Sequence, residues 1–143
     1  MIGQTEGVAF IDFDFNGNYS SGGIIPFSLD GGAGSELYAW IQTDGTVIFE
    51  VYNSFVAQVV ISGSIGAVGR KKIAFAYKQN DFAVYLNGTQ VGTDTSGTVP
   101  TMSRLFVGRY YANETYNINA GINQAVLFPT RLTNAELASL TTL

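Results

Sequence analysis

The sequence contains neither cysteine nor histidine. Without cysteine the chain can form no disulfide and offers no thiol nucleophile. Without histidine it loses the commonest general base and the commonest transition-metal ligand, which rules out a Ser-His-Asp triad and disfavours a zinc site. Binding or chemistry must therefore rely on carboxylates, amides, hydroxyls and aromatic rings.

Charge is also scarce. Only 13% of the 143 residues are charged, whereas about 25% is ordinary. Lysine and arginine together number 7, and the net charge is −4. Duplex binding needs several phosphate contacts, so nucleic acid is not expected as a partner. We interpret the one basic cluster, Arg70 to Lys72, as a solvated strand entrance.

Long apolar runs are missing as well. No run approaches the roughly 20 residues that span a bilayer, so membrane insertion is not expected. The first ten residues lack the basic region and apolar core of a signal peptide. A protein working outside the cell would then leave by another route, such as lysis of a host, unless this chain is a piece of a longer one. The length predicts a single domain over residues 1–143.

What the sequence does contain is short runs in which apolar and polar residues alternate. The clearest lies between Lys72 and Gly92. Every second residue from Ile73 to Tyr77 is large and apolar, and Phe82 to Leu86 repeats the pattern, as strands do. Asn87-Gly88 is typical of a two-residue hairpin turn, because both positions of a type I′ turn need positive φ.

Further strands are expected from the same alternation. Pro26 indicates an edge strand or a bulge. Thr133 and Glu136 form a capping box at the start of the one plausible helix, Thr133 to Leu140. Nine to eleven short strands separated by turns predict a sandwich or barrel. The further strands are Glu6–Phe15, Ile24–Leu29, Glu36–Gln42, Thr46–Tyr52, Val56–Ile61, Ser103–Arg109 and Gly121–Phe128. The phenylalanines expected in the core are Phe10, Phe13, Phe75, Phe82, Phe106 and Phe128.

Two groups of aromatic residues are candidate sugar platforms, because an aromatic ring stacks on the apolar face of a pyranose. Tyr38 and Trp40 share one strand face, and Glu50 or Tyr52 is expected across the hairpin from them. The second group lies in one loop and comprises Tyr110, Tyr111, Asn113, Tyr116 and Asn117. Two alternatives stay open: Trp40 as a core residue, and the tyrosine loop as an interface with another subunit or module.

The segments 82–92 (FAVYLNGTQVG), 105–108 (LFVG) and 121–137 (GINQAVLFPTRLTNAEL) follow one another in a characteristic order. In this order the chain resembles the concanavalin A-like lectin/glucanase superfamily, specifically its laminin-G-like and pentraxin-like members. Residues 74–100 and 104–109 also resemble lectin-like domains attached to tailed-phage structural proteins. The resemblance implies an all-β jelly-roll sandwich of two antiparallel sheets with one short C-terminal helix, whose concave sheet often forms a ligand groove.

The resemblance also implies a function. It favours a non-catalytic lectin-like module of a phage virion protein, in the tail or as capsid decoration, exposed on the virion surface or otherwise extracellular. Its expected partners are a host-surface glycan or polysaccharide and other virion proteins, and it is expected to form a homo-oligomer such as a trimer. The alternative is a purely structural oligomerisation or adhesion jelly roll without a sugar site.

A glycoside hydrolase is the third alternative. Members of the superfamily with that activity carry their carboxylates in an E-x-D-x-x-E or E-x-D-x-E pattern, which this sequence lacks. Asp12 and Asp14 are the nearest pair, and we interpret both as exposed acids on an outer face. Glu50 is interpreted as a solvated strand position. We therefore expect no enzymatic activity.

No cofactor is expected, with calcium as an open alternative. Its candidate ligands are oxygen-bearing side chains scattered singly along the loops. Turn chemistry explains each of them equally well, because Asp and Asn side chains fold back on their own backbone. They are Asp30, Asp44, Asp81, Asp94, Asn113, Glu114 and Asn117.

Overall fold

The computed structural model describes residues 1–112 and 115–143. Within them, ten strands and one helix follow one another along the chain. They are β1 (Glu6–Phe15), β2 (Ile24–Gly32), β3 (Ser35–Ile41), β4 (Thr46–Asn53), β5 (Val56–Ser64), β6 (Gly69–Lys78), β7 (Phe82–Leu86), β8 (Thr89–Asp94), β9 (Arg104–Val107), β10 (Ile122–Phe128) and α1 (Asn134–Thr141).

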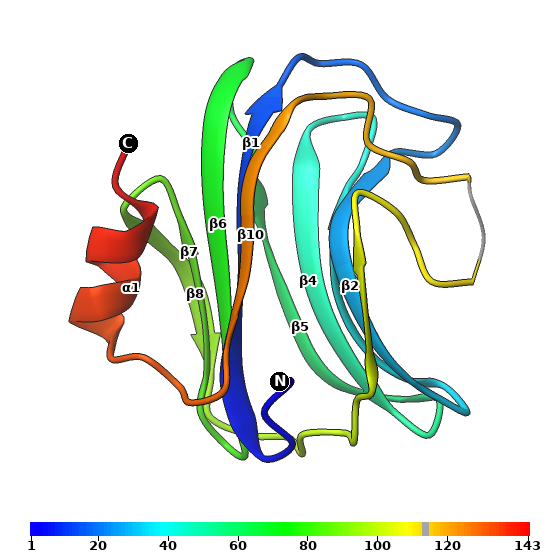
Figure 1. Cartoon of the computed structure of the whole chain (residues 1–143), viewed down its shortest axis with the longest axis vertical. Coiled ribbons are helices and arrows are strands. Elements are labelled where there is room, and N and C mark those ends of the chain that lie inside the picture. Colours follow the sequence, from blue (N-terminus) through cyan, green and yellow to red (C-terminus); the bar gives the residue numbers. More distant parts are fainter. Residues whose placement is uncertain (113–114) are drawn as a thin grey trace.

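The strands form two five-stranded antiparallel sheets packed face to face (Figure 1). The first sheet has the order β10-β1-β6-β7-β8, and the second has the order β5-β4-β3-β2-β9. Helix α1 lies outside this sandwich, against the first sheet. The predicted jelly-roll sandwich of two antiparallel sheets with a short C-terminal helix is confirmed.

The core lies between the sheets and follows the alternation of the strands. In β4, Val47, Phe49 and Val51 are fully buried, while the residues between them face outward. Phe49 meets Phe75 of the first sheet edge to face, with ring centroids 5.7 Å apart. Large apolar side chains from both sheets therefore interlock across the layer, as close packing requires.

Four of the six phenylalanines predicted in the core are buried, and Phe128 packs half-buried near α1. The prediction is wrong for Phe106. Its backbone pairs with Ser28, and this register places its ring on the outer face of the second sheet. There Arg104 and Arg109 lie over the ring, at 6.0 and 5.5 Å from its centroid.

The hairpin and the helix end as predicted. Asn87 and Gly88 have φ of 48° and 80° and join β7 to β8. The Asn87 side chain accepts a bond from the Lys72 N–H at 2.8 Å, which ties the turn to β6. At the helix, Thr133 and Glu136 form the predicted capping box, and the buried Leu137 packs on the outer face of the first sheet.

Two expectations need correction. Strand β2 lies between β3 and β9, so Pro26 does not mark an edge; the register shifts between Ile24 and Phe27, which is the bulge alternative. The basic cluster is not uniformly solvated, because Lys71 is buried and this burial lowers its pKa. Lys71 faces the sandwich interior, since the alternation of β6 turns every second residue inward.

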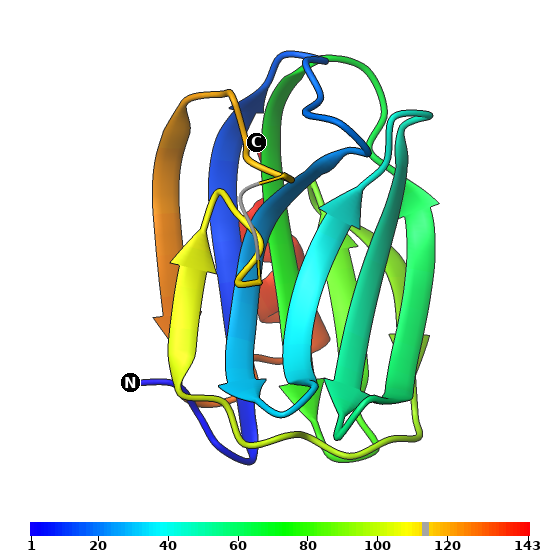
Figure 2. The same cartoon turned by 90° about the vertical axis from the view of Figure 1, so that its right-hand side faces the viewer.

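The outer face of the second sheet is covered in part by a loop, whereas the first sheet is covered by a helix (Figure 2). Helix α1 covers only the first sheet. The connection from β9 to β10 instead crosses in front of β2, and the Ile25 N–H donates to the Tyr116 carbonyl at 2.9 Å. No helix among the described residues is long and apolar enough to cross a membrane.

Candidate functional site

The site begins with strand β3, whose outward side chains are Glu36, Tyr38 and Trp40 because every second residue of a strand shares a face. The register between β3 and β4 determines which β4 residues lie beside these side chains. Tyr38 lies opposite Glu50, as part of the prediction had it. Trp40, however, lies opposite Ile48, so it pairs directly with neither Glu50 nor Tyr52.

The connection after β9 brings the tyrosine loop over this strand. Tyr110 contacts Tyr38 with ring centroids 5.5 Å apart, and Tyr116 contacts Trp40 at 6.0 Å. Tyr110 and Tyr116 are in turn 6.2 Å apart. The two platforms predicted separately therefore form one aromatic cluster. Trp40 lies half-buried on the outer face, so the core alternative for this residue is wrong.

Together, Tyr38, Trp40, Tyr110 and Tyr116 line a hollow of about 150 Å³ on the outer face of the second sheet. We call it the aromatic hollow. Pockets for drug-sized molecules have about 300–1,000 Å³, so this one suits a single ring-sized group. Offset and edge-on ring contacts of this kind hold the side chains in place before any ligand arrives.

The other predicted site residues lie at the rim or beyond. Tyr111 packs against Tyr110 with centroids 4.6 Å apart but does not line the aromatic hollow. Asn117 is exposed and is not part of the lining either. Asn113 lies outside the described residues.

Two carboxylates accept hydrogen bonds from the tyrosines of this face. Glu50 accepts hydrogen bonds from the Tyr38 hydroxyl at 2.5 Å and the Tyr52 hydroxyl at 3.3 Å. Glu36 is only 8% exposed and accepts a bond from the Tyr110 hydroxyl at 2.8 Å. Glu50 lies on the outer face as predicted, but it is half-buried and bound by two hydroxyls, so it is only partly solvated. The pattern of acid and aromatic residues at positions 36, 38 and 40 is the signal that could have identified Glu36.

These contacts shift the ionisation of the groups involved. Burial raises the pKa of the Glu36 carboxyl above its ordinary value, which the bond from Tyr110 only partly offsets. Burial, followed by the bond to Glu50, raises the pKa of the Tyr38 hydroxyl. Tyr110 is shifted in the same direction by burial and by its bond to Glu36. Both phenols therefore keep their protons at neutral pH and act as donors.

The predicted acid pair lies on the other side of the sandwich. Asp12 is 2% exposed, and its two oxygens accept bonds from Arg70 Nε at 2.9 Å and Nη2 at 2.6 Å. The Asn123 amide bridges Asp12 and Asp14 at 3.3 and 3.4 Å. The interpretation of both acids as exposed is wrong for Asp12, because cross-strand neighbours cover it. Its bonds to Arg70 hold the pKa of this carboxyl below its ordinary value.

Four of the five calcium candidates within the described residues already have partners. Asp44 accepts a bond from the Thr46 N–H at 2.9 Å, and Asp94 accepts one from the Ser96 N–H at 2.8 Å, as turn chemistry predicts. Asp30 pairs with Arg104. Asp81 pairs with Arg131 at 2.7 Å. In the described part of the chain, no three acidic side chains gather where they could hold a metal ion. Asn113 and Glu114 lie outside that part.

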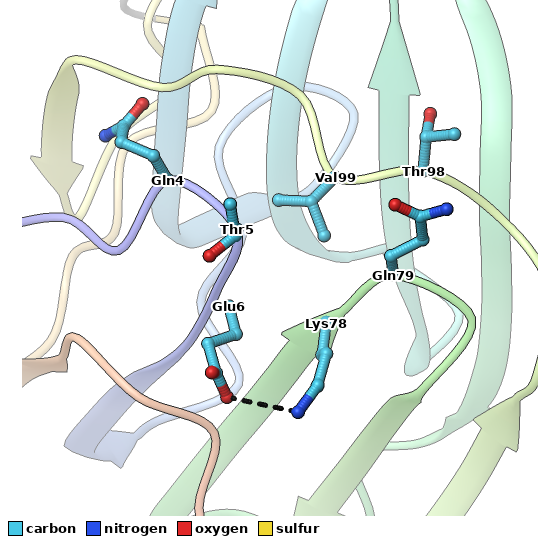
Figure 3. A pocket seen from close by; sticks show the side chains of 7 residues that line it. All are labelled: Gln4, Thr5, Glu6, Lys78, Gln79, Thr98 and Val99. Atoms are coloured by element: carbon cyan, nitrogen blue, oxygen red, sulfur yellow. Dashed lines mark ion pairs between the residues drawn. The ribbon is translucent and has the colours of Figure 1, made fainter.

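A larger hollow of about 240 Å³ lies at one end of the sandwich (Figure 3). Val99 is the largest apolar group in its lining, and Glu6 faces Lys78 across it at 3.7 Å. Its other lining side chains are Gln4, Thr5, Gln79 and Thr98. It offers polar side chains and no aromatic surface, so we place the candidate site at the aromatic hollow.

Comparison with known proteins identifies a family whose model matches the chain. A model of the concanavalin A-like lectin/glucanases superfamily matches residues 9–138. No curated protein matches the sequence. Several solved structures are similar, all at identities that show the fold alone.

One is the CBM40 module of Ruminococcus gnavus IT-sialidase bound to α2,3-sialyllactose, with a TM-score of 0.77 and 15% identity over 99% of this chain and 84% of that one. Another is the NanB sialidase of Streptococcus pneumoniae, with a TM-score of 0.78 and 14% identity; it is matched over 99% of this chain but only 24% of its own length. A third is the heptameric SAP-like pentraxin of Limulus polyphemus, with a TM-score of 0.67 and 14% identity over 94% of this chain and 69% of that one.

Proposed function

The chain belongs to the concanavalin A-like lectin/glucanases superfamily, and we propose that it is a non-catalytic glycan-binding module whose site is the aromatic hollow. The observation that carries this proposal is the convergence of four aromatic side chains from β3 and the tyrosine loop on one ring-sized hollow. Aromatic faces stack on the C–H faces of a pyranose. The fold likeness to a carbohydrate-binding module bound to sialyllactose supports the same function.

The arrangement of the carboxylates supports the non-catalytic part. A glycoside hydrolase brings two carboxyl groups to opposite sides of one glycosidic bond. Here Glu36 and Glu50 are each held by tyrosine hydroxyls and do not line the aromatic hollow. Asp12 is bound to Arg70 on the far side of the sandwich. Incubation with β-glucans should therefore release no reducing sugar.

We place the module on the surface of a phage virion, in the tail or as capsid decoration, where it would bind a host-surface glycan. The support is the resemblance of residues 74–100 and 104–109 to lectin-like domains of tailed-phage structural proteins. The low share of charged residues, 13%, agrees with an exposed virion protein. Mass spectrometry of purified particles of the encoding phage is the test, and particles without its peptides would refute this location.

Glycan binding can be tested on an array of host-surface and bacterial polysaccharides. Four proteins are compared: the wild type, Trp40→Ala, Tyr116→Ala and a control, Phe55→Ala. The control removes a ring that is 79% exposed and lies outside the aromatic hollow. Loss of one stacking ring should weaken binding about tenfold, while the control binds like the wild type. A blank array, or binding that survives Trp40→Ala, would refute the proposed site.

One observation favours a second candidate, an assembly module without a sugar site. The β4–β5 turn and β5 expose apolar side chains at Phe55, Val56 and Val60. The SAP-like pentraxin of Limulus polyphemus, which has a similar fold, is heptameric. On this hypothesis, copies of the chain associate through β5, as a trimer or another closed oligomer. Mass measurement at low concentration should then give an oligomer that Val60→Asp dissociates, and a monomeric wild type would refute it.

A further inference from the structure

We propose that the aromatic hollow accepts an uncharged sugar unit and rejects an anionic one such as sialic acid. This inference rests on the proposed glycan-binding function and names the ligand class of the same site. It separates this chain from the structurally similar CBM40 module, whose solved structure is bound to α2,3-sialyllactose. The argument follows from where the hydrogen-bond donors of the hollow point.

Three of the four side chains that line the hollow donate their protons into the protein. The Trp40 indole N–H donates to the Gly22 carbonyl at 3.1 Å. The Tyr38 hydroxyl donates to Glu50 at 2.5 Å, and the Tyr110 hydroxyl donates to Glu36 at 2.8 Å. A phenol has one proton to donate, so Tyr38 and Tyr110 keep only oxygen lone pairs for a ligand, and Trp40 keeps only its ring faces.

The hollow therefore offers acceptors and ring faces, which suit the hydroxyl donors and C–H faces of a neutral sugar. Tyr116 is the one lining residue whose hydroxyl makes no hydrogen bond within the described part of the chain, so a ligand meets at most this one donor there. A carboxylate needs several donors or a cation to replace its hydration shell. Leaving it largely unpaired in the hollow would be strongly unfavourable.

The charges around the hollow act in the same direction. Glu36 and Glu50 contact the hydroxyls of two of the lining tyrosines, and the aromatic ring faces themselves carry partial negative charge. The cations on this face, Arg104 and Arg109, are gathered around Phe106 on β9. Arg104 is in addition paired with the buried Asp30. Neither arginine is part of the described lining, so a bound anion would find no cation within the hollow.

The test is an array of matched glycans, each printed as the neutral form and as the same glycan capped with α2,3- or α2,6-linked sialic acid, together with neutral and uronic-acid-containing bacterial polysaccharides. The best ligands should be neutral, and a charged sugar at the bound position should weaken binding at least about tenfold. A sialylated or uronic ligand bound as strongly as its neutral partner, and lost in Trp40→Ala, would overturn this inference but keep the proposed function. Binding to no glycan would overturn both.

A charge variant tests the physical cause. Glu50→Gln removes one negative charge and keeps an oxygen to accept the Tyr38 proton. The preference for neutral over sialylated glycan should then fall about threefold, because one unit of repulsion is gone. Glu6→Gln is the matched control: Glu6 lies in the other hollow, shown in Figure 3. An equal preference in the wild type, Glu50→Gln and Glu6→Gln would refute the role assigned to this carboxylate.

Discussion

Replacement of Arg70 by methionine should destabilise the fold through Asp12. Methionine keeps most of the apolar stem of the side chain and removes both bonds to the carboxylate. Asp12 is 2% exposed, and the Asn123 amide at 3.3 Å would remain as its partner. Breaking a fully buried ion pair costs about 3–5 kcal/mol. The Arg70 side chain is 53% exposed, however, so water can replace part of the interaction.

The expected loss is therefore about 1–3 kcal/mol in the free energy of unfolding at pH 7. For a chain of this size, that lowers Tm by about 3–10 °C. Urea unfolding followed by circular dichroism gives the free energy, and calorimetry gives Tm. Lys78→Met is the control, because it removes the looser Glu6–Lys78 contact at 3.7 Å; such an exposed pair contributes about 0–1 kcal/mol.

The pH dependence adds a second, independent readout. Arg70 lowers the pKa of the Asp12 carboxyl below its ordinary 3.8. The stability that this pair provides is then fully present above pH 3.8 and is lost as the pH falls through the lowered pKa. The curves of wild type and Arg70→Met should therefore converge in acid.

Two results would refute the reasoning: equal stability of wild type and Arg70→Met at pH 7, or a difference that stays constant to pH 2. The variant Asp12→Asn distinguishes a structural role of this carboxylate from a catalytic one. We expect it to lose stability while glycan binding is unchanged. A glycan-hydrolysing activity that Asp12→Asn abolishes without loss of stability would instead assign this acid to chemistry.

Three smaller changes test other parts of the structure. Gly88→Ala should cost about 1–2 kcal/mol in urea unfolding, because φ is 80° and the new methyl would lie 3.2 Å from the Thr142 hydroxyl oxygen; an unchanged midpoint would contradict the assigned turn. Thr133→Ala should cost about 1 kcal/mol by removing the cap of α1, and Thr133→Ser should restore it. Burial raises the pKa of the Glu36 carboxyl, so the stability that its protonated form contributes is present below pH 4.5 and is lost as the pH rises through the raised pKa. Glu36→Gln should therefore reduce the fall in Tm between pH 4 and pH 7. An unchanged fall would contradict the burial effect.

Local patterns in the sequence were sufficient for the elements of the fold. Alternation located the strands, Asn87-Gly88 located the β7–β8 turn, and the spacing of Thr133 and Glu136 located the helix. Each of these signals depends on residues a few positions apart, and the physics that produces it is equally local. The sandwich then follows, because strands with one apolar face must bury it against another sheet.

The site was only partly predictable, since it depends on contacts between distant segments. Alternation separates Tyr38 and Trp40 from their neighbours but does not by itself decide which set faces inward, because both sets in β3 carry large side chains that can pack in a core. The meeting of these residues with Tyr110 and Tyr116 depends on how the β9–β10 connection folds back over β2. Nothing in the local sequence encodes that path.

The same limit explains the misinterpreted acid. Asp12 was correctly placed on an outward face, but its burial results from Arg70, 58 residues away, on the neighbouring strand. The register pairs Asp12 with Lys72 and Asp14 with Arg70. The long Arg70 side chain therefore reaches Asp12 from the next position along the same face of the sheet. A strand pattern predicts the face of a residue, whereas its exposure depends on the length and direction of side chains on the next strand.

The position of helix α1 decides how the protein can be displayed. The helix and the C-terminus lie on the side of the first sheet (Figure 1). The residues that line the aromatic hollow lie on the outer face of the second sheet, on the opposite side of the sandwich. A copy anchored through its C-terminus to a sensor chip or bead therefore points its hollow toward the solution. Many copies anchored side by side would present a layer of parallel sites. Weak single contacts with a repeating polysaccharide would then add up to firm adhesion without any change in the site itself.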